Sequence, residues 1–180
     1  MSRVNRTRYT ILGCLTIEPM SGYDIKKFVD ECVSHFWNES YGQIYPTLEK
    51  MEADGLIKGR RESGERGADR IVYRITAAGR KDLSDWLLEP AESQSPRDEY
   101  SLKLFFGHVV GPAGSIEHIA RLRESSRAAL DGLAAAEPEL EASDAPWAPY
   151  RLAVLRGGLR YTEMVLEWCD ATESDLRKLE

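Results

Sequence analysis

Hydrophobic residues recur at helical spacing between residues 40 and 55 of the chain. Ser40 is a typical N-cap residue and Gly55 a typical helix end, so these two residues bound the predicted helix. One stripe of this helix is apolar and consists of Tyr41, Ile44, Leu48 and Met51. The opposite face carries Gly42, Gln43, Pro46 and Lys50. Because Pro46 lacks an N–H donor, we expect the first turns of the helix to be irregular.

Two short segments after this helix, residues 56 to 61 and 70 to 75, have the β-branched and alternating character of strands. The residues expected to face inward are Ile57, Ile71, Tyr73 and Ile75. The segment between the strands, ESGERGAD, is rich in glycine and charge, which indicates a turn. A helix followed by a strand, a turn, a second strand and the start of a helix is typical of a winged helix.

Three further helices are predicted in the first half of the chain. The first ends at Pro19, and its apolar face consists of Tyr9, Ile11, Leu12 and Leu15. Ser21 and Asp24 form a capping box that opens the second, in which the apolar residues are Tyr23, Ile25, Phe28 and Val29. Thr76 is the expected N-cap of a fourth helix that runs through Leu83.

The second half of the chain predicts one short and two long helices. Residues 98 to 107 are apolar nearly all round, so we expect a short buried helix. Residues 111 to 114, GPAG, break the chain, and Ser115 starts a long helix that ends before Pro138. Residues 147 to 168 form a second long amphipathic helix, and residues 172 to 175 either cap a last short helix or fray.

The predicted fold is mainly α with a two-stranded β wing. We expect a winged helix-turn-helix domain at residues 1 to 88, a connector at 89 to 97 and a helical domain at 98 to 180. Two long helices with few other elements cannot bury both of their apolar faces within one chain. Pairing with a second copy through residues 115 to 137 and 147 to 170 is the simplest remedy, so we expect a homodimer.

The net charge of the chain, −6, argues against binding to nucleic acid when it is considered alone. The charge is unevenly distributed, because residues 1 to 88 hold 14 Lys and Arg against 13 Asp and Glu, whereas the rest hold 10 against 17. Residues 58 to 74 have six cations and three anions, a local balance of +3. A basic β-ribbon beside a helix is the electrostatic pattern expected of a wing that contacts phosphates.

These observations select a set of candidate DNA-contacting residues. The helix that begins after Ser40 presents an amide and a cation on a face with little bulk, which suits a major groove. Tyr41 is open to two interpretations, support of the core and a phosphate contact through its hydroxyl. The candidate set is Tyr23, Lys26, Ser40, Tyr41, Gln43, Tyr45, Lys50, Arg60, Arg61, Arg66 and Arg70.

The segments SYGQIYPTLEKMEADGLI and VYRITAAGR resemble the signature of the PadR family of bacterial transcriptional regulators. The resemblance extends upstream through ILGCLTIEPMSGYDIKKFV and more loosely into the helical C-terminal part, so it covers most of the chain. It implies a dimeric DNA-binding protein, usually a repressor, whose C-terminal helices dimerise and in many members respond to a small molecule. The alternative is a winged-helix module for protein–protein interaction, which the acidic second half permits.

If an effector exists, we expect it to be a small apolar or aromatic molecule. Because pockets form preferentially at domain junctions, we expect its site near the junction of the two domains. The residues expected to line its site are Trp86, Phe105, Phe106 and Trp147. For each of these aromatic residues, ordinary packing in the core or at a dimer interface is the alternative interpretation.

Other chemistry is not indicated by the sequence. The histidines lack the spacing of metal ligands, and no nucleophile or acid pair has a recognisable catalytic context, so we expect no metal, no cofactor and no enzyme activity. The three cysteines are far apart and are expected to be reduced and at least partly buried: Cys14, Cys32 and Cys169. No apolar run has the length of a signal peptide or a membrane span, so we expect a cytoplasmic protein with no membrane contact.

Overall fold

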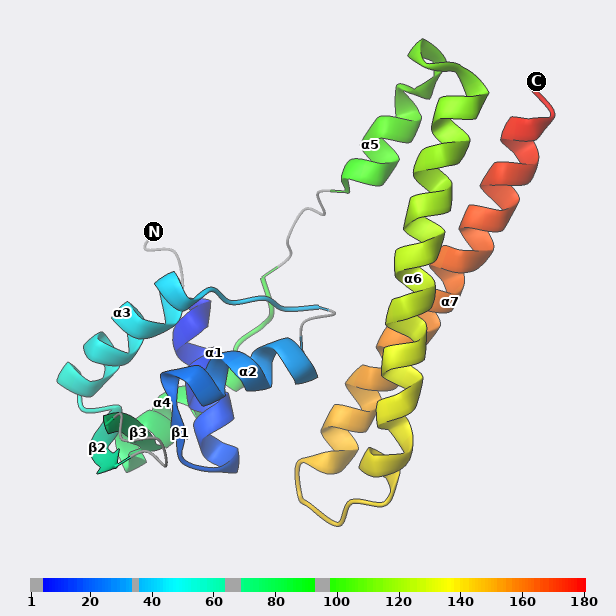
Figure 1. Cartoon of the computed structure of the whole chain (residues 1–180). Coiled ribbons are helices and arrows are strands. Elements are labelled where there is room, and N and C mark those ends of the chain that lie inside the picture. The colour runs from blue at the N-terminus through cyan, green and yellow to red at the C-terminus, as the bar shows by residue number, and fades with distance from the viewer. Residues whose placement is uncertain (1–4, 34–35, 64–68, 93–97) are drawn as a thin grey trace. The chain divides into compact units, whose positions relative to one another are not determined.

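A computed structural model describes residues 5–33, 36–63, 69–92 and 98–180 of the chain. The chain separates into two compact units, Met1–Ser93 and Gln94–Glu180, and each unit is described by itself below (Figure 1).

Unit 1 contains four helices, and the sequence marks the start of each. Asn5 and Thr76 cap α1 and α4 through their side chains, and Ser21 and Asp24 form the predicted capping box at α2. The helices are α1 (Arg6–Ile17), α2 (Gly22–Cys32), α3 (Tyr41–Ala53) and α4 (Ala77–Leu87). The four predicted helices are therefore confirmed.

A small antiparallel sheet completes unit 1. Its strands are β1 (Met20–Ser21), β2 (Ile57–Ser63) and β3 (Asp69–Ile75), in the order β1-β3-β2. The mainly helical fold with a β wing is confirmed, but β1 was missed because two residues carry no alternating pattern. Ile71 was predicted to face inward and is exposed, since it lies opposite Arg61, toward the turn and away from the helices.

The core of unit 1 lies where α1, α2 and α3 meet the root of the sheet. Its largest fully buried side chains come from these three helices and from β2: Ile11, Leu12, Ile25, Val29, Ile44, Leu48, Met51 and Ile57. Gly79 of α4 allows close approach to the core, because a Cβ there would lie 2.2 Å from the Leu56 carbonyl oxygen. Any side chain at this position would push α4 away from β2.

Tyr41 lies at the end of the predicted apolar stripe, and two interpretations of it were left open. It is 45% exposed, because it lies in the first turn beyond the edge of the core. The expectation of irregular first turns is wrong, because the helix is continuous through Pro46. The carbonyl of Gly42, which loses its N–H partner to Pro46, belongs to an exposed residue, so water can satisfy it.

Unit 2 consists of α5 (Glu99–Phe105), the short 3-10 helix η1 (Gly107–Val109), α6 (Gly111–Glu141) and α7 (Ala148–Arg177). α6 is longer than predicted at both ends. It starts at Gly111 because Pro112 suits a first turn, and it continues past Pro138 to its last residue, Glu141. α7 runs without interruption through residues 172 to 175, so neither a separate last helix nor fraying is present there.

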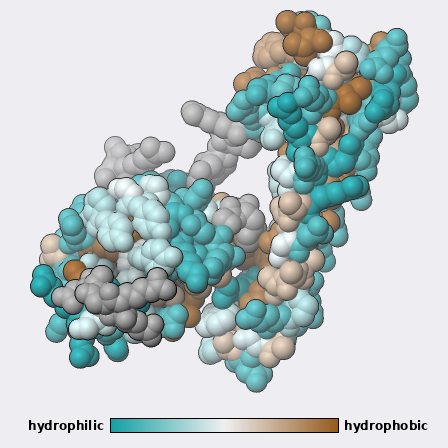
Figure 2. Space-filling view, in the orientation of Figure 1, coloured by the Kyte–Doolittle hydropathy of each residue, from teal (hydrophilic) through white to brown (hydrophobic). Residues whose placement is uncertain are grey.

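The short helix α5 was expected to be buried, and this prediction is wrong. α5 contains no buried residue, and Phe105 is 77% exposed. A neighbouring group of exposed apolar side chains comprises Leu102, Phe105, Phe106, Val109 and Val110, which we call the α5 patch. Figure 2 shows hydrophobic surface at this end of unit 2. The sequence of α5 is apolar nearly all round, but too few other elements of the single chain pack against this helix to bury it.

α6 and α7 form an antiparallel pair whose contact line is narrow. Ile119 of α6 and Leu155 and Cys169 of α7 are its buried apolar residues, apart from Ala148 at the start of α7. Ion pairs join the two helices near both ends, from Arg123 Nη2 to Glu173 Oε2 at 2.5 Å and from Arg156 Nε to Glu137 Oε1 at 2.7 Å. Within the described residues, no helix is both long enough and apolar enough to cross a membrane.

Candidate nucleic-acid interface

The exposed surface of α3 has three parallel strips, because successive residues of a helix are rotated by about 100°. One edge strip carries Tyr41 and Tyr45, and the other carries Gln43 and Lys50. The outermost strip between them consists of Gly42, Pro46 and Glu49, all exposed. We call these three strips together the α3 outer face. It has little bulk at its centre and polar or aromatic side chains at its edges.

Gln43, the predicted base-reading amide, takes part in the cap of its own helix. Its Oε1 accepts hydrogen bonds from the Ser40 hydroxyl at 2.9 Å and from the Ser40 backbone N–H at 3.3 Å. This is half of a capping box, for which the Ser-x-x-Gln spacing was a visible signal that the sequence analysis did not use. The amide oxygen is thus occupied, and the Nε2 hydrogens remain the donors of this side chain.

Two tyrosines and a lysine form a group beside the N-terminal half of α3. The rings of Tyr41 and Tyr45 are stacked with centroids 6.1 Å apart, and Lys26 Nζ lies 5.7 Å from the Tyr41 ring centre. Lys26 also forms an ion pair with Asp30, so its charge is already partly balanced. Tyr23 is exposed in the first turn of α2 rather than part of its apolar face.

Gly22 determines how closely Tyr45 approaches α2. A Cβ at Gly22 would lie 2.7 Å from Tyr45 Cε1 and 3.2 Å from Leu48 Cδ1. The Tyr45 ring can therefore pack this closely against the start of α2 only because residue 22 has no side chain. This role was not predicted, since a glycine after an N-cap residue has no distinctive sequence pattern.

The cations of the wing are divided between two faces of the β-ribbon. In the β2–β3 register, Lys58 lies opposite Arg74, Arg60 opposite Val72, and Glu62 opposite Arg70. Because side chains alternate along a strand, one face carries four cations and one acid: Lys58, Arg60, Arg70, Arg74 and Glu62. We call it the basic wing face. Arg61 lies on the other face, and Arg66 lies outside the described residues.

Arg70 connects the wing to α2. Its Nη1 lies 3.7 Å from Asp24 Oδ2, the carboxylate that also completes the α2 capping box. Partial burial alone would raise the pKa of Asp24, but hydrogen bonds from the backbone and hydroxyl of Ser21, aided by Arg70 and Lys27, lower that pKa below its usual value. The wing and the start of α2 therefore share one ionised carboxylate.

The C-terminal half of α3 is attached to the other side of the wing. Glu52 Oε1 accepts a hydrogen bond from the Gly59 backbone N–H at 2.7 Å. A Cβ at Gly59 would lie 2.8 Å from the same oxygen, so the approach requires glycine. The pKa of the neighbouring Tyr73 phenol is raised, first by burial and then by the charges of Glu52 and Glu49. The C-terminal half of α3 and the wing are thus joined by a direct hydrogen bond.

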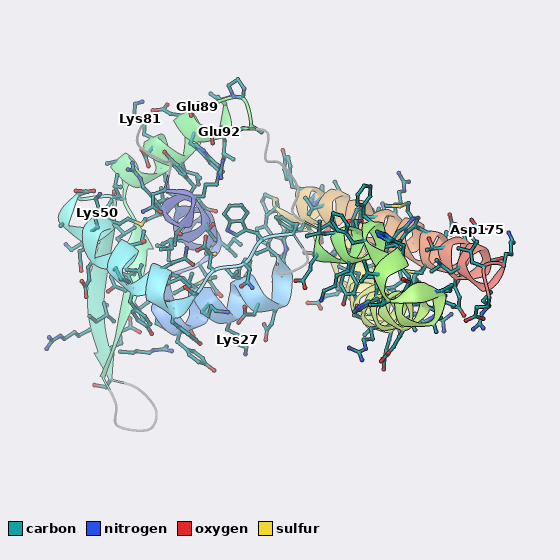
Figure 3. The ribbon with its side chains drawn as sticks, turned by 90° about the horizontal axis from the view of Figure 1, so that it is seen from above. Lys27, Lys50, Lys81, Glu89, Glu92 and Asp175 are labelled. Atoms are coloured by element: carbon teal, nitrogen blue, oxygen red, sulfur yellow. The ribbon has the colours of Figure 1, made fainter. Side chains whose placement is uncertain are left out.

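Lys50 and Lys27 lie at the surface of unit 1, on α3 and α2 (Figure 3). The predicted DNA-contacting residues that the structure describes lie on α2, on α3 with its N-cap Ser40, and on the β2–β3 ribbon. Arg61 is the exception on the wing, because it points from the opposite face of the ribbon.

The predicted effector-lining residues belong to separate units. Trp86 is in unit 1, where its ring stacks on Tyr9 with centroids 4.3 Å apart and planes 4° from parallel. In unit 2, the rings of Phe105 and Phe106 meet edge to face, and the Arg151 guanidinium lies 4.7 Å from the centre of the Trp147 ring system. Each of these residues has an aromatic or cationic packing partner of its own.

The described part of the chain contains no cluster of side chains that could hold a metal ion. Cys14 and Cys169 are buried and Cys32 is partly buried, as expected from the sequence. Burial raises the pKa of the Cys169 thiol, which disfavours a reactive thiolate there.

Comparison with known proteins covers nearly the whole chain. Residues 11–85 match the model of the transcriptional regulator PadR-like family, and residues 96–177 match the model of the virulence activator alpha C-terminal region. The negative transcriptional regulator PadR of Bacillus subtilis is 34% identical over 100 residues, which are 55% of this chain and 55% of that protein.

Solved structures of that Bacillus subtilis regulator extend the likeness to both units. Its complex with operator DNA has a TM-score of 0.82 at 26% identity and covers 94% of this chain and 98% of that chain. Its complex with p-coumaric acid has a TM-score of 0.75 at 25% identity and covers 98% and 99%. With both the sequence signature and the two-unit fold matched, the chain belongs to the PadR-like family of transcriptional regulators.

Proposed function

We propose that the protein is a sequence-specific DNA-binding repressor that acts as a homodimer on an inverted-repeat operator and is released by a small molecule. The observation that supports DNA binding most directly is the attachment of α3 to the wing through the hydrogen bond from the Gly59 N–H to Glu52, which places the α3 outer face and the basic wing face in one unit. A helix in a major groove needs a neighbouring cationic element to hold its register on the phosphates.

In this proposal α3 enters the major groove and the wing follows the adjacent backbone. Gln43 donates from Nε2 to a base edge, because its Oε1 is held by Ser40. Lys50, two turns further along the same strip, contacts a base or a phosphate. The cations of the basic wing face neutralise phosphates, while Tyr41 and Tyr45 contact the backbone through their hydroxyls. The complex of the related Bacillus subtilis PadR with operator DNA supports DNA binding by this fold.

Titration with a pool of random duplexes at several salt concentrations tests the proposal. We expect enrichment of one sequence, and a log–log plot of affinity against salt whose negative slope reflects the number of neutralised phosphates. Gln43→Ala should relax the preference at one base position and cost about 1–3 kcal/mol against the best sequence. Absence of binding at low salt would contradict the proposal and favour the alternative, a protein–protein interaction module.

The homodimer is proposed from the unpartnered surface of unit 2. Tyr150, Val154, Tyr161 and Met164 of α7 are exposed, and their separations of four, seven and three positions place them on one stripe, here called the α7 stripe. The stripe lies apart from the buried contact line with α6, so a second helix can pack on it. Two copies would place their α3 helices about 34 Å apart, one turn of DNA. Light scattering that finds a monomer at micromolar concentration would refute this part.

Release by an effector is proposed from the aromatic residues of unit 2 and from the p-coumaric acid complex of the related regulator. We expect the dimer to have two arrangements, of which one binds DNA. A small aromatic or apolar molecule that binds the other arrangement more tightly lowers DNA affinity, and the difference between its affinities for the two arrangements limits the size of the effect. Trp147→Ala and Trp86→Ala are the informative variants. A residue that touches the ligand should lose the response while DNA affinity without ligand stays intact, whereas a packing residue should lower both the melting temperature and DNA affinity.

A further inference from the structure

A buried carboxylate lies directly before the N-cap of α3. Glu39 is only 4% exposed, although acidic side chains are rarely buried unless they are paired. None of the mechanisms proposed above uses it. A buried group of this kind costs stability unless its hydrogen bonds are satisfied, so its partners indicate what it does.

Three neutral donors satisfy Glu39, and two of them come from α1. Thr7 Oγ1 donates to Oε2 at 2.9 Å. Thr10 Oγ1 lies 3.3 Å from Oε1 and 3.2 Å from the Arg6 carbonyl oxygen, so its single proton is divided between these two acceptors. Trp37 Nε1 donates to Oε1 at 2.8 Å from the segment that precedes α3. Among the described residues, no cation lies within ion-pairing distance of this carboxylate.

The helix that supplies these donors is itself fixed to the end of unit 1. Besides the Tyr9–Trp86 stack, two ion pairs join α1 to α4 and to the residues that follow it. Figure 3 labels Glu92, which follows the end of α4 in the sequence. The ion pairs are Arg8 Nε with Asp82 Oδ2 at 2.8 Å and Arg6 Nη2 with Glu92 Oε2 at 2.6 Å. α1 therefore connects the start of α3 to the last described residues of unit 1.

We propose that Glu39 is a positioning residue for DNA recognition, which fixes the first turn of α3 on α1 through Thr7 and Thr10. The inference rests on the proposed function, because it assigns to α3 the reading of DNA. Gln43 and Tyr41 lie within one turn of this anchor, and a base-reading side chain must be held to within about 0.5 Å of its productive place. Loss of the anchor therefore weakens specific contacts more than contacts to phosphates in general.

Removal of the α1 donors tests the anchor without a change of charge. Thr7→Val and Thr10→Val keep the side-chain shape, and Thr16→Val is the matched control, because its hydroxyl bonds only within α1, to the Gly13 carbonyl. We expect Thr7→Val to weaken binding to the preferred duplex about 5- to 10-fold, since a buried acceptor loses a donor. Thr10→Val should weaken it less, because the Thr10 hydroxyl also bonds to the Arg6 carbonyl. Binding to a random duplex should change less than about 2-fold, and Thr16→Val should match the wild type.

Glu39 itself is tested with two variants in the full chain, at a temperature where circular dichroism shows the native fold. Glu39→Ala should lose more specific affinity than either threonine variant, and Glu39→Gln should recover most of it, because the amide can accept from Trp37 and donate to Thr7. Equal losses on preferred and random duplexes would overturn the proposal. If Glu39→Ala does not fold, the threonine variants decide.

Amide hydrogen exchange supplies a readout that does not require DNA. The anchor predicts faster exchange at the first turn of α3 and at the Trp37 indole N–H in Thr7→Val, with α4 unchanged. Uniformly faster exchange across unit 1 would show a merely structural role and would refute the proposal. If the wild type shows no DNA preference, the proposed function fails, whereas the exchange pattern still decides whether Glu39 fixes α3.

Discussion

The two units of this chain are stabilised in different ways. Unit 1 encloses a continuous apolar core, to which α1, α2, α3 and the sheet all contribute. Unit 2 has two much longer helices of 31 and 30 residues, yet α5 buries nothing and α6 buries only Ser115, Ile119 and Ser126. A unit with its own core can reach its fold alone, whereas a unit with unpartnered apolar surface is complete only when something covers that surface. Substitutions in unit 1 should therefore unfold it, whereas substitutions on the apolar surface of unit 2 should separate it from whatever covers that surface.

The largest effect is expected in the core of unit 1. Leu48→Ala should lower the free energy of unfolding of unit 1 by about 2–5 kcal/mol, because Leu48 is fully buried beneath the α3 outer face. Thermal or urea unfolding followed by circular dichroism measures the change. Leu88→Ala, at a leucine that is 84% exposed, is the control and should stay within about 0.5 kcal/mol of the wild type. Equal effects at both leucines would contradict the assigned core.

The next effect concerns assembly rather than folding. Tyr161 is 66% exposed in the single chain and lies on the α7 stripe, so Tyr161→Glu should raise the dissociation constant of the proposed dimer about 30-fold or more. Analytical ultracentrifugation measures it, and the unit 1 transition should be unchanged. Glu163→Ala, exposed but off the stripe, is the control. Unfolding of unit 1 in Tyr161→Glu would remove the distinction between the two units.

A smaller effect separates the two faces of the wing. Arg60→Ala removes a cation from the basic wing face and should reduce the salt slope of DNA binding by about one unit. Arg61→Ala removes the same charge from the opposite face and should leave the slope closer to that of the wild type. Both residues were predicted to contact DNA, so the pair of titrations distinguishes binding by one face of the wing from binding by both faces. Equal salt slopes in the two variants would favour binding by both faces of the wing.

The smallest effect is a dependence of unit 1 stability on pH. The folded-state pKa of Asp24 is lowered, so its contribution is present above its unfolded pKa, about 4, and is lost as pH falls through the folded value. Asp24→Asn should therefore flatten the stability profile below about pH 4. Its side chain is 38% exposed, so we expect a change under about 1 kcal/mol at neutral pH. An unchanged acid profile would count against this contribution.

Local signals predicted unit 1 well because its helices begin at recognisable caps and its apolar residues face one core. Ser21, Ser40 and Thr76 each start a helix where expected. The candidate site was less accessible, because strand register decides that Arg60 and Arg61 diverge, and space alone decides the roles of Gly22 and Gly59. Neither register nor free space is visible in one sequence.

Prediction failed in unit 2 where a pattern has two physical solutions. The apolar character of α5 was interpreted as burial within the chain, but the same pattern fits a surface that another molecule covers. Pro112 and Pro138 were assumed to break helices, although proline is compatible with a first turn and the α6 helix tolerates one near its end. The length of α6 was therefore underestimated.

The two-residue strand β1 has a consequence for the motions of unit 1. Ser21 pairs with Val72 of β3 and at the same time caps α2, while Asp24 of that cap faces Arg70 of β3. The first turn of α2 cannot separate from the wing without loss of both sets of contacts. The wing and the start of α2 should therefore open together in a single cooperative fluctuation.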